Sequence, residues 1–99
     1  MNSKYARARD ANHGEIRDTL RRIPGVRVLD TGSLGGGHSD LLVKVRNRVL
    51  WLEIKDPTQS PSAQRLSPLE QKFQAFIGDG YHVVTTKAEA LRLVLEVIS

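Results

Sequence analysis

The clearest alternation of apolar and polar residues lies between positions 40 and 55. Residues 40–45 and 48–55 are rich in Val, Leu, Ile and Trp, and the segment between them contains Asn47, a residue type that tolerates tight turns. The pattern predicts a β-hairpin with Asn47 and Arg48 at the centre of its turn. One face of this hairpin is wholly apolar and consists of Leu41, Val43, Val45, Leu50, Leu52 and Ile54.

The other face of the hairpin carries the candidate chemistry. Asp40 and Glu53 are diagonal neighbours in the register that pairs Val45 with Leu50, and diagonal positions lie roughly 7–8 Å apart by Cα. Two carboxylates at that distance can share one cation, and Lys55 projects from the same face. A slip of one residue would turn the apolar set to water, so the pattern specifies which side chains share a face.

A simpler interpretation is that Glu53 and Lys55 form a charge pair on a solvent-facing sheet. Trp51 belongs to the same face, and an aromatic residue there favours a covered surface. The sequence therefore favours a functional site over a solvated pair.

Apolar residues at helical spacing flank the hairpin. Asn12 is a possible N-cap for a first helix, which Pro24 and Gly25 end. Ser67-Pro68-Leu69-Glu70 combines an N-cap, a proline at the first helical position and a capping-box glutamate. The predicted order is helix 12–23, strand 26–29, glycine-rich loop 31–37, hairpin 40–55, loop 56–66, helix 67–77, strand 81–85 and helix 86–98.

These elements predict an α/β fold in the order α-β-β-β-α-β-α, a small mixed sheet flanked by helices. At 99 residues the chain is one domain, residues 1–99, with 1–11 as a possible flexible basic arm. The core of so short a chain is modest, and oligomerisation is a plausible source of further burial. The last helix has more apolar residues than one sheet face requires, which predicts a homodimer interface there.

Composition excludes several classes of protein. The sequence has no cysteine, so it has neither disulfides nor thiolate metal sites. It contains no long apolar run and no secretory leader, which argues against membrane insertion and makes the cytoplasm the expected location.

Positive charge is concentrated at the start of the chain. Residues 1–27 contain seven basic and three acidic residues. Residues 28–99 contain eight basic and eight acidic residues, whose charges cancel. Phosphates supply most non-specific affinity for nucleic acids, so this segment predicts DNA binding. A solvated helix face is an equally weighted alternative. The candidate DNA contacts on the first helix are Arg17, Arg21 and Arg22.

The glycine-rich loop before Asp40 has two interpretations. It matches neither the dinucleotide-binding nor the P-loop fingerprint, and its glycines would let a DNA backbone approach or simply leave the hairpin flexible. Ser33 and His38 lie in or beside this loop and are further candidates for DNA contact.

Asp40, followed thirteen residues later by Glu53-Ile54-Lys55, resembles the motif of the PD-(D/E)XK nuclease superfamily. His38-Ser39-Asp40 replaces the usual Pro-Asp. The motif, the W-L-E-I-K strand, the S-P-L-E-Q helix start and the G-Y-H-V-V strand together make the chain similar to small phage-type VRR-NUC nucleases. Archaeal-type Holliday-junction resolvases are the next most similar group. The resemblance covers roughly residues 12 to 90 and implies a restriction-endonuclease-like core, in the host cytoplasm if the chain is phage-encoded.

The chemistry of the motif follows from its residue types. Mg²⁺ prefers hard oxygen ligands, which Asp40, Glu53 and the Ile54 carbonyl would supply, and Mn²⁺ is expected to substitute. The ion would stabilise charge on the phosphate and acidify a water that Lys55 holds or helps to deprotonate. The resemblance implies Glu15 as a third acidic group, against its alternative as an ordinary first-turn glutamate. It also implies a site role for Gln71, although the helical wheel places Gln71 nearly opposite Phe73, at the rim where it could touch DNA.

Two functions remain open from sequence. The first is a Mg²⁺-dependent, structure-selective endodeoxyribonuclease that acts as a homodimer on branched DNA such as a four-way junction, because the chain has little room for sequence readout. The second is a DNA-binding accessory module that keeps the fold but is inactive alone or needs a partner.

Overall fold

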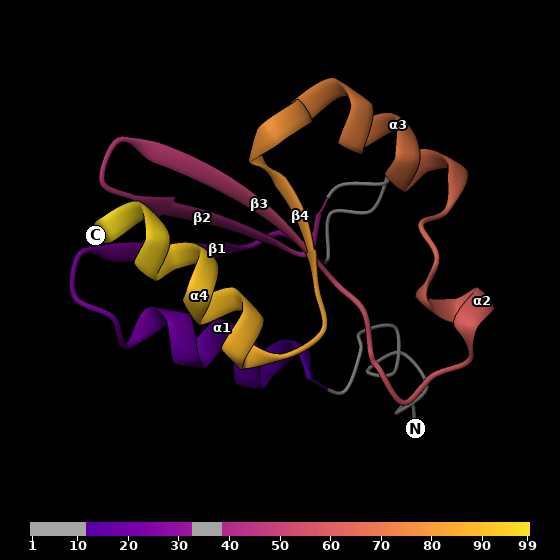
Figure 1. The fold of residues 1–99 in the computed structure, drawn as a ribbon, viewed down its shortest axis with the longest axis horizontal. Helices are drawn as coiled ribbons and strands as arrows, with labels where there is room; N and C mark the ends of the chain where they lie inside the picture. Colours follow the sequence, from indigo (N-terminus) through magenta and orange to yellow (C-terminus); the bar gives the residue numbers. More distant parts are fainter. Residues whose placement is uncertain (1–11, 33–38) are drawn as a thin grey trace.

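The computed structural model describes residues 12–32 and 39–99 (Figure 1). Its four strands form one mixed sheet in the order β1-β2-β3-β4. The first three strands are antiparallel neighbours, and β4 runs parallel to β3. The predicted α/β class and element order are confirmed. The elements are α1 (His13–Arg21), β1 (Val26–Asp30), β2 (Leu41–Val45), β3 (Arg48–Ile54), α2 (Pro61–Gln64), α3 (Pro68–Ile77), the 3₁₀ turn η2 (Gly78–Gly80), β4 (Tyr81–Val84) and α4 (Lys87–Ile98).

The hairpin of β2 and β3 keeps the predicted faces but not the predicted register. Val45 pairs with Arg48 instead of Leu50, so Arg46 and Asn47 form the turn. Arg46, and not Asn47, has a positive φ of 56°. The shift is two residues, and because side chains alternate with period two, every side chain stays on its predicted face.

The core lies between one face of the sheet and the helices α1 and α4, which lie beneath the sheet in Figure 1. The wide apolar stripe of α4 has a physical reason here, because α4 packs against both the sheet and α1. Leu93 and Val97 are partly buried against the core, so the interpretation of all surplus apolar residues as partner surface was wrong. The core residues are Ile16, Leu20, Val26, Leu41, Val43, Val45, Leu50, Leu52, Ile54, Val84, Ala90 and Val94.

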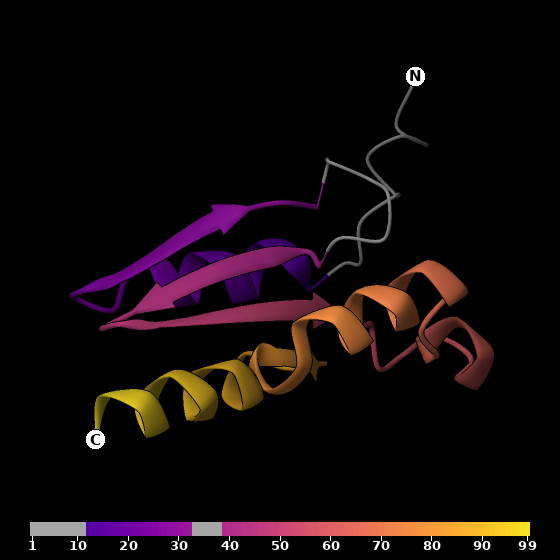
Figure 2. The same ribbon diagram turned by 90° about the horizontal axis from the view of Figure 1, so that it is seen from above.

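Helix α3 covers part of the opposite face of the sheet. Phe73 makes edge-on contacts with Trp51 and Tyr81, with ring centroids 5.2 and 6.0 Å apart. Figure 2 shows that α3 lies toward one end of the sheet and leaves β1 uncovered. Leu29 and Val83 on this face are correspondingly exposed.

The helix starts follow the capping signals closely. Ser67 and Glu70 form the predicted reciprocal capping box. Thr86 accepts from the N–H of Glu89, but the Glu89 carboxylate bonds Thr85. The region predicted as loop 56–66 contains the short helix α2, which Ser60 caps. No helix in the described part of the chain is long and apolar enough to cross a membrane.

Candidate active site

Chemically active side chains gather at one end of the sheet, where β1 and β3 end and β2 begins. Asp30 is the last residue of β1, Asp40 directly precedes β2, and Glu53 and Lys55 lie at the end of β3. The first turns of α1 and α3 reach the same end through His13 and Glu70. Elements distant in sequence thus contribute to one site.

Asp40 is held against the edge of β3 by two hydrogen bonds. Its N–H donates to the Leu52 carbonyl at 2.9 Å, and its Oδ2 accepts from the Ile54 N–H at 2.8 Å. The register differs by two residues from the predicted one, so Asp40 lies closer to Glu53 along the strands than the predicted diagonal. Ile54 orients the Asp40 carboxylate through its N–H, whereas metal binding by its carbonyl stays a prediction.

The Glu53 carboxylate is buried, with only 4% of the residue exposed. Its Oε2 lies 3.7 Å from Lys55 Nζ, and its Oε1 is buried without a hydrogen-bond partner. Burial, reinforced by the negative charges of Asp40 and Glu70, raises the pKa of Glu53 to about 9 despite the nearby Lys55. A raised pKa in a group beside a charge partner is typical of functional sites.

Glu70 is a site residue that sequence analysis recognised only as a helix cap. Its Oε1 accepts from the Ser67 N–H at 2.8 Å and from Lys55 Nζ at 3.1 Å. Burial opposes the charge of Glu70, but the bonds from Ser67 and Lys55 outweigh it and lower its pKa. The capping box therefore fixes a carboxylate that orients Lys55, and no sequence signal indicated this second contact.

His13 on α1 faces Asp40 and was not assigned a role from sequence. The residue is 2% exposed, and its Nε2 lies 3.1 Å from Asp30 Oδ1. Its Nδ1 lies 3.9 Å from Asp40 Oδ1. Arg17 also binds Asp30, through Nη1 at 3.0 Å. The site thus has a second, unpredicted layer built from α1 and β1.

Asn12 attaches the start of α1 to the site. It is the N-cap, as predicted, but its side chain makes no capping bond. Its Nδ2 instead donates to the carbonyls of Lys55 and Thr85, at 3.2 and 2.6 Å. The amide joins the ends of β3 and β4 to α1, and so sets the position of His13, the next residue.

Two residues implied by the resemblance lie outside this cluster. The Glu15 side chain is 59% exposed and pairs with Lys87 at 3.4 Å, because its place on α1 turns it away from the face that His13 occupies. Gln71 is exposed and donates to the Leu66 carbonyl at 3.0 Å, since it lies on the outer side of α3. The structure brings neither side chain to the cluster, and their roles in the site stay predictions.

The predicted DNA contacts are divided. Arg17 binds Asp18 and Asp30 and so supports the site. Arg21 donates to the Val28 carbonyl and Arg22 is exposed; both lie at the end of α1 away from the site. Ser33 and His38 lie outside the described residues.

The cluster contains donor atoms of the kinds that bind metal ions. Within residues 12–32 and 39–99, no three His, Cys, Asp or Glu side chains form a group that could hold a metal as arranged here. Nevertheless, Glu53 Oε1 and His13 Nδ1 are both buried without hydrogen-bond partners. Buried polar atoms are rarely left unsatisfied, so each of these two atoms is a candidate ligand, although they and Asp40 do not form a complete set of ligands in this arrangement.

Comparison with known proteins adds no family assignment. No protein-family model, curated protein or solved structure matches this chain.

Proposed function

We propose that this chain is a metal-dependent endodeoxyribonuclease of the PD-(D/E)XK type, similar to VRR-NUC nucleases. The observation that carries the proposal is the Glu53 carboxylate, which is buried beside Asp40 and Lys55 and retains an unpartnered oxygen. Burying an uncompensated carboxylate is costly, and a divalent cation is the partner that would compensate it.

Each side chain has a role that its contacts support. Asp40 and Glu53 would supply oxygen ligands, and the Ile54 N–H holds Asp40 in place. Bound Mg²⁺ or Mn²⁺ would offset charge on the phosphate under attack. Lys55, oriented by Glu70, would hold the attacking water or help deprotonate it and would bind phosphate.

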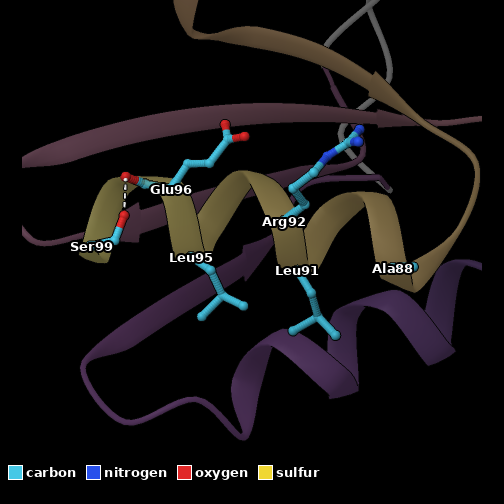
Figure 3. Close-up of a pocket in the computed structure, with 6 residues that line it drawn as sticks. All are labelled: Ala88, Leu91, Arg92, Leu95, Glu96 and Ser99. Carbon is cyan, nitrogen blue, oxygen red and sulfur yellow. Dashed lines mark hydrogen bonds between the residues drawn. The ribbon is translucent and has the colours of Figure 1, made fainter.

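The expected substrate is branched DNA, such as a four-way junction, cut by a homodimer. One domain of 99 residues has little surface for sequence readout. A two-fold dimer would present two such sites to two strands. An apolar groove along α4 is the candidate interface, and Figure 3 shows Leu91 and Leu95 on the side of α4 opposite to Arg92 and Glu96.

A DNA-binding accessory module, inactive alone, is the second candidate. Lys55 Nζ lies 3.1 Å from Glu70 and 3.7 Å from Glu53, contacts that a purely structural charge network would also make. In that case Lys55, Glu53 and Glu70 would be a buried charge network without a catalytic role.

A cleavage assay distinguishes the two functions. Labelled linear, flap and four-way DNAs are incubated with Mg²⁺, Mn²⁺ or EDTA. We expect metal-dependent cutting that prefers the four-way junction and falls by orders of magnitude in Asp40→Asn, Glu53→Gln and Lys55→Ala, each with an unchanged circular dichroism spectrum. Glu15→Gln and Gln71→Ala are matched controls expected near wild-type rate. Full activity of Glu53→Gln would refute the site, and DNA binding without cutting under any metal would establish the accessory module.

A further inference from the structure

His13 presents an unusual combination of burial and incomplete bonding. The residue is 2% exposed, yet its Nδ1 is buried without a hydrogen-bond partner. That nitrogen points toward the site, with Asp40 Oδ1 at 3.9 Å. The other ring nitrogen is bonded, with Nε2 3.1 Å from Asp30 Oδ1.

Asp30 determines which nitrogen carries the ring proton. An ionised carboxylate only accepts hydrogen bonds, so Nε2 must donate to Asp30. Arg17 Nη1 and the Gly32 N–H fix the same carboxylate at 3.0 and 3.2 Å. When Nε2 carries the single ring proton, the lone pair of Nδ1 is directed toward Asp40 Oδ1 at 3.9 Å.

We propose that His13 Nδ1 is a ligand of the divalent cation held by Asp40 and Glu53, with Asp30 as its orienting carboxylate. This assignment rests on the proposed function. Two atoms that each lie about 2.0–2.2 Å from one cation are at most about 4.4 Å apart, and the 3.9 Å between His13 Nδ1 and Asp40 Oδ1 falls within that limit. The Glu53 carboxylate, whose Oε1 is buried without a hydrogen-bond partner, would supply the third ligand.

The surroundings of His13 match those of a metal-binding histidine. Such histidines usually donate their second N–H to a carboxylate, which fixes the tautomer and ring orientation. Gly32 leaves room for the ring, since a Cβ at this position would lie 3.1 Å from His13 Cε1 and 3.4 Å from Asp40 Oδ1. Glu15, two residues further along α1, points to Lys87 and is not required.

A nitrogen ligand changes the expected metal preference. Mg²⁺ favours oxygen ligands, whereas imidazole suits transition metals, and affinity rises from Mn²⁺ to Co²⁺. A site with His13, Asp40 and Glu53 is therefore expected to bind Mn²⁺ and Co²⁺ more tightly than Mg²⁺.

The test uses Mn²⁺ and the full chain. Pulsed electron paramagnetic resonance of bound Mn²⁺ detects a directly coordinated imidazole nitrogen, and calorimetry gives the affinity. We expect a ¹⁴N coupling that is replaced by a ¹⁵N coupling when the histidines are ¹⁵N-labelled. The coupling should persist in the His38→Gln/His82→Gln variant, in which His13 is the one remaining histidine. Asp30→Asn should weaken Mn²⁺ binding by about 10–100-fold, and His13→Gln should abolish the coupling.

The outcomes separate this inference from the proposed function. If wild-type protein binds Mn²⁺ in an Asp40-dependent manner but shows no nitrogen coupling, His13 is a structural group between Asp30 and Asp40, and the inference is overturned while the nuclease proposal stands. If wild-type protein binds neither Mn²⁺ nor Mg²⁺, both are overturned. The labelling experiment needs no substitution at His13, so it decides the matter even if His13→Gln does not fold.

Discussion

The Glu53 carboxylate lies in surroundings that oppose its charge. Its pKa is about 9 in the folded chain, against 4.5 as the ordinary value. Between these values the folded state binds more protons than the unfolded state, so this group stabilises the fold below pH 4.5 and loses that contribution as the pH rises to about 9. A residue that lowers stability at working pH is expected where function, and not folding, requires it.

Replacing Glu53 by Gln should therefore stabilise the metal-free protein. The gain should grow between pH 5 and pH 9 and reach about 0.5–2 kcal/mol, the range of single stabilising substitutions. Urea unfolding at several pH values measures it, with Glu96→Gln, an exposed position on α4, as the control. Equal stability of Glu53→Gln and wild type at every pH would contradict the burial argument.

At the scale of elements, Glu70 and Glu89 form a natural comparison. Both carboxylates accept a backbone N–H at the start of a helix, from Ser67 and Thr85 respectively. Only Glu70 also binds Lys55. Comparing substitutions at the two residues therefore distinguishes the effect of helix capping from the effect of holding Lys55.

Glu70→Gln and Glu89→Gln should each lower the free energy of unfolding by about 1 kcal/mol, because each weakens a helix start. For a domain of this size that corresponds to a fall of about 4–8 °C in Tm. Only Glu70→Gln should slow cleavage, by about tenfold, because it releases Lys55. Thermal unfolding and single-turnover cleavage check the pair. A Glu70→Gln enzyme with wild-type rate would show that Glu70 is a cap alone.

The elements of this fold were predictable because their signals are local. The capping box at Ser67 predicted the start of α3, and the alternation in residues 41–54 predicted the faces of the strands. Because side chains alternate along a strand, the alternation also placed Glu53 and Lys55 on the same face. The register was missed because Arg46, a residue with no turn preference, takes the left-handed position. His13 and Glu70 were missed because their roles depend on how α1 and α3 lie over the sheet, which no local pattern encodes.

At the scale of the whole molecule, positive charge offers two paths for DNA. Arg21 and Arg22 lie at the far end of α1, and a nine-residue helix is about 13 Å long. Arg27 and Lys44 are paired neighbours on the sheet face that α3 covers only in part. Arg17 belongs to neither path, because neutralising it would also release Asp30.

Replacing Arg21 and Arg22 by Ala should flatten the dependence of log K on log salt by about 1.8, since each phosphate contact contributes about 0.9. Fluorescence anisotropy on junction DNA at several salt concentrations measures the slope, and Arg27→Ala/Lys44→Ala is the matched double variant. An unchanged slope in the first variant and a flattened one in the second would place the DNA on the open sheet face. The basic face of α1 would then be only solubilising.

Assembly is the property that most affects the proposed mechanism. Leu93 and Val97 on α4 are partly buried against the core and cannot form much of a dimer interface. Leu95 is 51% exposed and lines the groove on α4. A competing apolar surface exists on α3, where Phe76 is 85% exposed. These two surfaces are the candidates for a dimer interface.

We expect wild-type protein to be a dimer in light scattering, and Leu95→Glu to be a folded monomer that loses paired cutting of a four-way junction but still nicks one strand. A charge placed in an apolar interface is costly to bury, whereas the same charge on a free surface changes little. Phe76→Glu is the matched variant, and if it alone yields monomers, the interface lies on α3. A wild-type protein that stays monomeric at high concentration would contradict the two-site mechanism, because one site on one small domain cannot cut two strands symmetrically. That result would favour the accessory module.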